Sequence, residues 1–136
     1  MTRLADLEHL VTLSDARYRR EQQSIQRVLA EENRLRASLR QLDLHLQESR
    51  QNCDEAQRAL GADLLWHGWV GRKKTQLNQQ LARLLVIKEQ HLKQVRHAYG
   101  KLLVSQRIRD DAKSVQRKKR RDAALDQAIE TAVFRK

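Results

Sequence analysis

The chain has 136 residues, of which 33% are charged, only 4% are aromatic and none is proline. So few aromatic side chains exclude a thick globular core, whereas the abundance of Gln, Arg, Leu and Ala is typical of long helices and coiled coils. The net charge of +11 lies in the second half of the chain. Residues 1–60 hold ten Arg and ten Asp or Glu, whereas residues 61–136 hold 18 Lys or Arg and seven acids.

The first predicted element is a helix over residues 3–60. Steps of four and three residues from Leu7 reach sixteen positions, of which twelve are apolar. An unbroken repeat of 3.5 residues is typical of a coiled-coil seam rather than of the broader face of a globular helix. The polar members Ser14, Glu21 and Glu32 are expected to weaken the packing. The seam is Leu7, Val11, Ser14, Tyr18, Glu21, Ile25, Val28, Glu32, Leu35, Leu39, Leu42, Leu46, Ser49, Cys53, Ala56 and Leu60.

A bend is predicted over residues 61–71, which contain three of the four glycines and both tryptophans. Gly61 follows the last seam residue, where a glycine commonly ends a helix. Exposed tryptophan beside leucine or valine is usual at binding hot spots, which makes Leu65, Trp66, Trp69 and Val70 a candidate partner-binding site. The alternative is that the indoles fold back and plug the end of the hairpin.

The second predicted helix covers residues 70–132. Its apolar positions take two consecutive steps of four around Lys88, which predicts a local stutter in the coiled coil. Gly100 marks either a close approach of the two helices or a weak point. The predicted seam consists of Val70, Leu77, Leu81, Leu84, Lys88, Leu92, Val95, Tyr99 and Leu102, followed by Ile108, Ala112, Val115, Leu125, Ile129 and Ala132. Two arms of similar length predict an all-α fold, a long two-helix antiparallel coiled-coil hairpin that forms a single domain over residues 1–136.

A basic run interrupts the second helix, and no apolar residue lies within it. The hairpin is expected to fray there, or the helix to project beyond its partner. The run is a second candidate partner-binding site, for an acidic protein surface, although a solvated helix face is the alternative. It lacks the interleaved aromatics that stack on bases, which argues against sequence-specific DNA binding but leaves nonspecific attraction to polyanions open. The run is Arg117, Lys118, Lys119, Arg120 and Arg121.

No catalytic motif is found in the sequence. It contains no phosphate-binding loop, no paired carboxylates in a pocket and no metal-binding spacing among its five histidines. We therefore expect a protein that is not an enzyme, with no catalytic residue, cofactor, metal site or small-molecule substrate. The single Cys53 indicates a reducing compartment, and the absence of a long apolar run predicts a cytoplasmic protein without a transmembrane segment.

The pattern resembles the small central-stalk proteins of type III secretion systems, the YscO/FliJ-like group. The resemblance is carried by the leucine-spaced opening Leu4, Leu7 and Leu10, by the basic stretch 17–21, by the glycine- and tryptophan-containing bend, and by the basic tail from Gln106 through Asp126. It implies a two-helix antiparallel coiled coil without catalytic activity, located at the cytoplasmic side of the inner-membrane secretion apparatus. The implied partners are the hexameric export ATPase, a membrane export-gate protein and, in some members, export chaperones.

Two other functions stay open from the sequence. The first is a general coiled-coil adaptor or export chaperone that holds a partner helix with Trp66 and Trp69. The second is a basic helical protein that binds nucleic acid without sequence preference, an option weakened by the scattering of the basic run around the helix.

Overall fold

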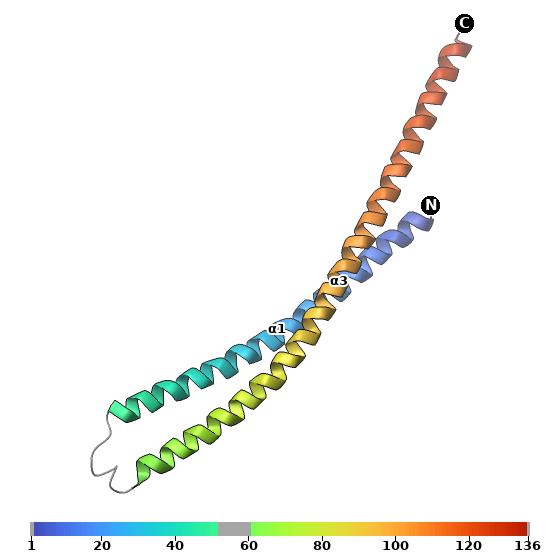
Figure 1. The fold of residues 1–136 in the computed structure, drawn as a ribbon. Helices are drawn as coiled ribbons and strands as arrows, with labels where there is room; N and C mark the ends of the chain where they lie inside the picture. Colours follow the sequence, from blue (N-terminus) through green and yellow to red (C-terminus); the bar gives the residue numbers. More distant parts are fainter. Residues whose placement is uncertain (1, 52–60, 136) are drawn as a thin grey trace. The chain divides into compact units, whose positions relative to one another are not determined.

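The computed structural model of the chain describes residues 2–51 and 61–135 and places them in two helices, α1 (Thr2–Gln51) and α3 (Ala62–Phe134) (Figure 1). No strand occurs within these two ranges. The helices pack against each other, which confirms the predicted all-α helical hairpin. The last part of the predicted first helix, with the seam positions Cys53, Ala56 and Leu60, lies outside the described residues.

The structure differs from the predicted bend over residues 61–71, because α3 already begins at Ala62 and continues without a break to Phe134. Among residues 2–51 and 61–135 only Gly61 has a positive φ, of 72°, and its carbonyl accepts a hydrogen bond from the Leu65 N–H at 3.2 Å. Gly71 lies inside the helix. A glycine there costs about 1 kcal/mol relative to alanine, a penalty that the burial of the neighbouring Val70 offsets.

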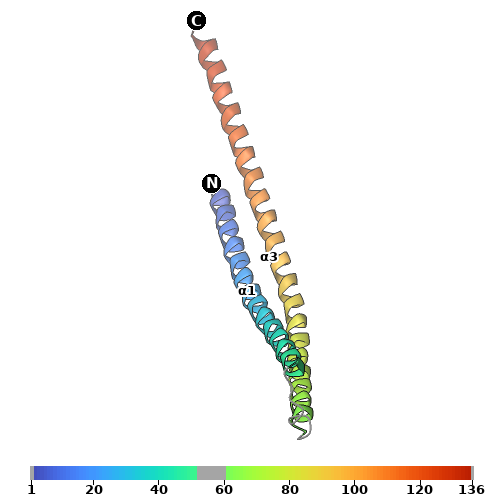
Figure 2. The same ribbon diagram turned by 90° about the vertical axis from the view of Figure 1, so that its left-hand side faces the viewer.

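The chain divides into two compact units, which are described separately. Unit 1 comprises residues 1–21 and 95–136, and unit 2 comprises residues 22–94. In unit 1, Lys113 Nζ lies 3.3 Å from Glu8 Oε1, and the rings of Tyr18 and Tyr99 meet edge to face with centroids 5.2 Å apart. From the first contact to the second, the residue number increases along α1 and decreases along α3, so the two helices of unit 1 are antiparallel (Figure 2).

Unit 2 is also antiparallel, and it contains the chain's central apolar cluster. Lys88 pairs with Glu32, and farther along α1 Asp43 pairs with Lys74, which lies earlier on α3. Between these two ion pairs, Leu35 of α1 packs with two leucines of α3. The cluster consists of Leu35, Leu77 and Leu81, with Leu39, Leu42 and Leu84 packed against it.

The seam predicted for α1 is confirmed along its described length. Every predicted position from Leu7 to Ser49 is buried or half-buried, including the polar members. The alternation of four and three residues keeps these positions on one stripe of the helix, which α3 covers. Periodicity along α1 was therefore a sufficient guide to the face that it buries.

The second half of the seam predicted for α3 is confirmed only in part: Leu92, Val95, Leu102 and Ala112 are buried or half-buried, whereas the other predicted positions are exposed. At the predicted stutter both His91 and Leu92 are half-buried, and farther on the buried positions are Ala98 and Ser105 instead of Tyr99 and Ile108. Ala98 is 4% exposed and Ser105 is 3% exposed, and the Ser105 hydroxyl donates to the Leu102 carbonyl at 2.8 Å. The observed seam is Val70, Lys74, Leu77, Leu81, Leu84, Lys88, His91, Val95, Ala98, Leu102, Ser105, Arg109, Ala112 and Gln116.

Ala98 and Ser105 were not predicted as seam residues because alanine is small and serine is polar. A search for large apolar side chains passes over alanine and serine, although both permit two helices to approach closely. Serine can be buried when its hydroxyl bonds to the backbone of its own helix. The polar seam members Lys74, Lys88 and Arg109 have long side chains that can bury their methylene groups while the charge reaches water or a carboxylate.

Glu32 is an ion-paired member of the seam of unit 2 and not a simple polar break. Its side chain is largely buried, and its two carboxylate oxygens accept from different cations. Lys88 Nζ of α3 lies 2.9 Å from Oε2, and Arg36 Nη2 of α1 lies 3.1 Å from Oε1. The hydrogen bond from Lys88, assisted by Arg36 and opposed by desolvation, lowers the pKa of Glu32. A charge pair at facing seam positions favours this register, since any slip would leave a carboxylate buried without its cation.

We predict that Leu35→Ala lowers the free energy of unfolding by about 2–5 kcal/mol, because it opens a cavity at the centre of the leucine cluster. Urea unfolding followed by far-UV circular dichroism measures this change. The matched control is Leu44→Ala on the same helix, where the leucine is exposed and the loss should stay within about 0.5 kcal/mol. Equal losses in the two variants would contradict the seam.

We predict that part of the stability disappears in acid through Glu32. Its folded pKa lies below the ordinary glutamate value of about 4.3, so its contribution is complete above that value and is lost as the pH falls through the lowered pKa. Glu32→Gln should therefore have a lower Tm than the unchanged chain at pH 7, and the difference should shrink as the pH falls below about 4.

Thermal melts between neutral and acid pH measure this convergence. The control is Glu89→Gln, at an exposed glutamate of α3 in the same unit. This variant should follow the pH dependence of the unchanged chain. If Glu32→Gln kept the same Tm difference at every pH, the ion pair with Lys88 would not contribute to stability.

Candidate functional site

An exposed apolar patch lies on the first turns of α3. We call Leu64, Leu65, Trp66 and Trp69 the tryptophan patch. Both leucines are largely exposed, Trp66 is 36% exposed and Trp69 is 44% exposed. The two indoles stack with their centroids 5.2 Å apart and an interplanar angle of 18°. The stacking follows from the helix, because residues three apart lie on the same face one turn from each other.

The tryptophan patch matches the predicted site in three of its four residues. Val70 is only 2% exposed, so it belongs to the seam between the helices and offers no surface to a partner. It is buried because it stands on the 3.5-residue repeat of α3, whereas Leu65 does not. Leu64 was missed by the prediction, although an apolar residue directly before Leu65 was a visible signal.

The sequence left two roles open for the indoles, binding a partner or packing against the hairpin, and Trp69 combines both. Trp69 lines a surface hollow together with Leu35, Leu42 and Leu77, which belong to the leucine cluster of unit 2. The same side chain keeps nearly half of its surface exposed. Trp66 contributes the second ring of the stack. Such a rigid pair of indoles presents a large apolar area with little conformational entropy to lose on binding.

The second candidate site, the basic run Arg117–Arg121, is fully helical and exposed at every position. The helix does not fray there, because α3 continues to Phe134. In unit 1 the described part of α1 reaches the level of this run at its beginning, where Arg3 and Lys119 line the same hollow. Beyond that level α3 projects past the end of α1 at Thr2 (Figures 1 and 2).

The basic run does not act as one surface. Arg117, Arg120 and Arg121 line one hollow together with Ser114, since residues three and four apart share a helix face. Lys119 instead borders the groove between the helices, beside Leu4 and Leu7. The three arginines form a cationic surface, which we call the arginine face. It can attract a carboxylate or phosphate, and guanidinium groups bind either one in a bidentate manner.

Among the described residues, no group of three or more His, Cys, Asp or Glu side chains is placed to hold a metal ion. Within the same residues, neither helix contains a stretch that is both long and apolar enough to cross a membrane. The tryptophan patch and the arginine face are both suited to binding a partner.

Comparisons with known proteins give no further guide to these surfaces. No protein-family model, no curated protein and no solved structure matches the chain.

Proposed function

We propose that the chain is a non-enzymatic coupling stalk of a type III secretion or flagellar export apparatus, which links the hexameric export ATPase to the membrane export-gate protein. The observation that carries the proposal is the form of unit 1, a two-helix coiled coil from which one helix continues alone with an exposed cationic surface. The resemblance of the sequence to the central-stalk proteins of these systems supports the same assignment.

The seam supports a mechanical role. Side chains interlock along α1 and α3 in each unit, and the helices are also joined by the cross-helix ion pairs Glu8–Lys113, Glu32–Lys88 and Asp43–Lys74. A continuous 3.5-residue repeat resists sliding of one helix along the other, because every slip exposes apolar side chains or separates a charge pair. A stalk needs this resistance to transmit a displacement from one partner to another.

The arginine face supports an electrostatic contact with a ring. Attraction between a cationic helix and an acidic ring opening acts over about 10 Å at 0.1 M salt and depends little on orientation. A helix inside a hexamer must contact several identical subunits in turn, so a contact without strict geometry suits it. In this proposal the chain acts in the cytoplasm, at the inner-membrane secretion apparatus, and export chaperones are additional partners.

The tryptophan patch favours a second candidate function, that of a coiled-coil adaptor or export chaperone. Stacked, partly exposed indoles beside two exposed leucines are suited to hold an apolar partner helix. This function needs the tryptophan patch, whereas the stalk function needs the arginine face. The two can therefore be separated by substitution.

For the stalk function, we predict that the chain binds the export ATPase of its own organism and raises its rate of ATP hydrolysis or its assembly into hexamers. Replacing Arg117, Arg120 and Arg121 by Glu should abolish the effect, because it turns the attraction of the arginine face into repulsion. Steady-state ATP hydrolysis and sedimentation of the ATPase measure both changes.

The matched control replaces three exposed cations of unit 2, Arg72, Lys73 and Arg83, by Glu. This control variant changes the net charge by the same amount and should retain most of the increase in ATP hydrolysis or hexamer assembly. Equal loss in both variants would show that only the net charge matters. Absence of binding and of any change in rate or assembly with the unchanged chain would refute the stalk function.

For the adaptor function, we predict that binding of an export chaperone shifts the tryptophan emission to shorter wavelength. Trp66 and Trp69 are the only tryptophans of the chain, so a chaperone variant without tryptophan makes the emission specific to the patch. Trp66→Ala with Trp69→Ala should weaken binding, measured by calorimetry, by about 30-fold or more, whereas the double Phe variant should retain most of it. Unchanged affinity of the double Ala variant would leave the patch with a packing role only.

A further inference from the structure

A second apolar stripe runs along α3 beside the seam and is not covered by α1. All of its members except Val104 were predicted to lie in the seam, yet each is exposed in the structure. They lie on the same alternation of four and three residues, one position before the seam residues Ser105, Arg109 and Gln116, and the charged residues Asp111, Lys118 and Asp122 occupy the remaining positions. The stripe consists of Val104, Ile108, Val115, Leu125 and Ile129.

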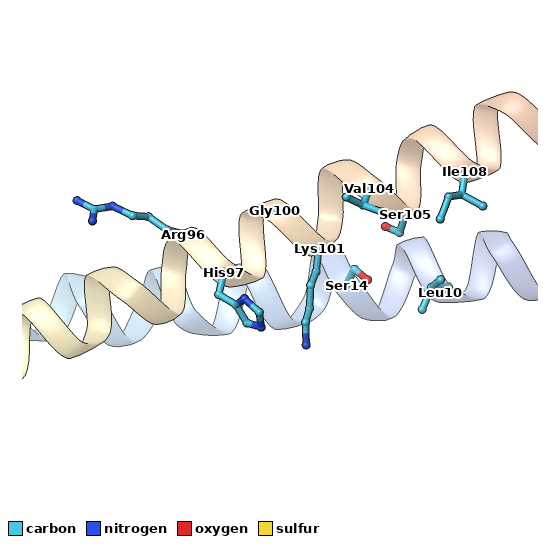
Figure 3. Close-up of a pocket in the computed structure, with 9 residues that line it drawn as sticks. All are labelled: Leu10, Ser14, Arg96, His97, Gly100, Lys101, Val104, Ser105 and Ile108. Carbon is cyan, nitrogen blue, oxygen red and sulfur yellow. The ribbon is translucent and has the colours of Figure 1, made fainter.

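The first part of this stripe lines a groove between the two helices of unit 1, which we call the unit 1 groove. Figure 3 shows its upper part, where Leu10 and Ser14 of α1 lie opposite Gly100, Val104 and Ile108 of α3. The lower part shares Ile108 and continues between Leu4 and Leu7 of α1 and Val115 of α3.

Apolar residues at heptad spacing on a surface between two helices are the pattern that receives a third helix. The groove borders α3 from Arg96 to Lys119, a helical length of about 36 Å at 1.5 Å per residue. Gly100 leaves space in its floor, because a Cβ added there would meet no atom within 4 Å. This also shows that Gly100 does not mark a close approach of α1 and α3.

The charges at the border of the groove select the occupant. Arg96 and Lys101 line the upper part without any carboxylate, and Arg3 and Lys119 line the lower part with the single acid Asp111. Unit 1 as a whole holds 16 Lys or Arg against nine Asp or Glu. A second copy of the chain would bring the same cationic border against this one, which costs electrostatic energy. An acidic helix would neutralise it.

We propose that the unit 1 groove binds an acidic amphipathic helix of a partner protein, whose apolar stripe lies on Leu10, Val104 and Ile108 and whose carboxylates face Arg96, Lys101 and Lys119. The helix forms a three-helix coiled coil with α1 and α3, and it can continue along α3 onto Leu125 and Ile129. This surface is separate from both the tryptophan patch and the arginine face, and it does not depend on the proposed stalk function.

The test uses the full chain and a synthetic helical peptide of about 24 residues, matched to the length of the groove. The peptide carries leucine at alternating steps of three and four residues, glutamate beside the leucines and a fluorescent label. Fluorescence anisotropy should show saturable binding of one peptide per chain. Gly100→Trp should weaken it by about tenfold or more, because the indole fills the groove. Arg96→Glu with Lys101→Glu should also weaken it, through repulsion of the glutamates.

Gly71→Trp is the matched control, since a Cβ at Gly71 also meets nothing within 4 Å and the site lies in unit 2. It should bind the peptide like the unchanged chain. Far-UV circular dichroism should show that both tryptophan variants stay helical, since tryptophan is a better helix former than glycine.

Four outcomes would overturn the proposal. They are unchanged binding by Gly100→Trp, equal binding of a peptide with the same composition but a scrambled leucine spacing, displacement of the peptide by vesicles that contain phosphatidylserine, and formation of a dimer that Gly100→Trp abolishes. The second would indicate electrostatic attraction alone, the third a membrane-surface site and the fourth a second copy of the chain in the groove.

Discussion

The packing of α1 against α3 depends on a narrow stripe of contact that recurs every 3.5 residues. Two helices alone can bury only such a stripe, so each residue in it carries a large share of the stability. The positions of the stripe are buried or half-buried along the described length of α1 and from Val70 to Gln116 of α3. All other faces of both helices stay in contact with water, which explains why a third of the chain is charged.

Polar residues inside the stripe determine how the helices align. Leucines alone pack in several registers with similar energy, whereas Glu32, which is 7% exposed, has a cation of α3 at hydrogen-bonding distance only when Lys88 faces it. Ser105 shows the other way in which a seam accepts a polar group, since its hydroxyl bonds to the backbone of its own helix. Leucine packing therefore stabilises the seam, and the Glu32–Lys88 ion pair favours its register.

The same narrow contact explains why binding surfaces are plentiful on this molecule. A two-helix packing has no room for apolar residues outside one stripe, so the tryptophan patch and the second stripe of α3 stay exposed. The arginine face begins at the level where α1 starts at Thr2, and α3 continues beyond that level. Exposed apolar and cationic surfaces on a firmly packed support are suited to holding several partners at once.

The sequence by itself determined the all-α class, the buried face of α1 and the positions of the tryptophans and the basic run, because each follows from local composition or helical period. Only the tertiary structure decided where α3 begins, that Val70 lies in the seam and not in the partner-binding surface, and that Ala98 and Ser105 enter the seam in place of Tyr99 and Ile108. Periodicity alone could not predict which stripe of α3 is buried, because two stripes one residue apart have the same repeat. Which of them is buried depends on the size and charge of the residues on the opposite helix, and those are known only when the two helices are packed together.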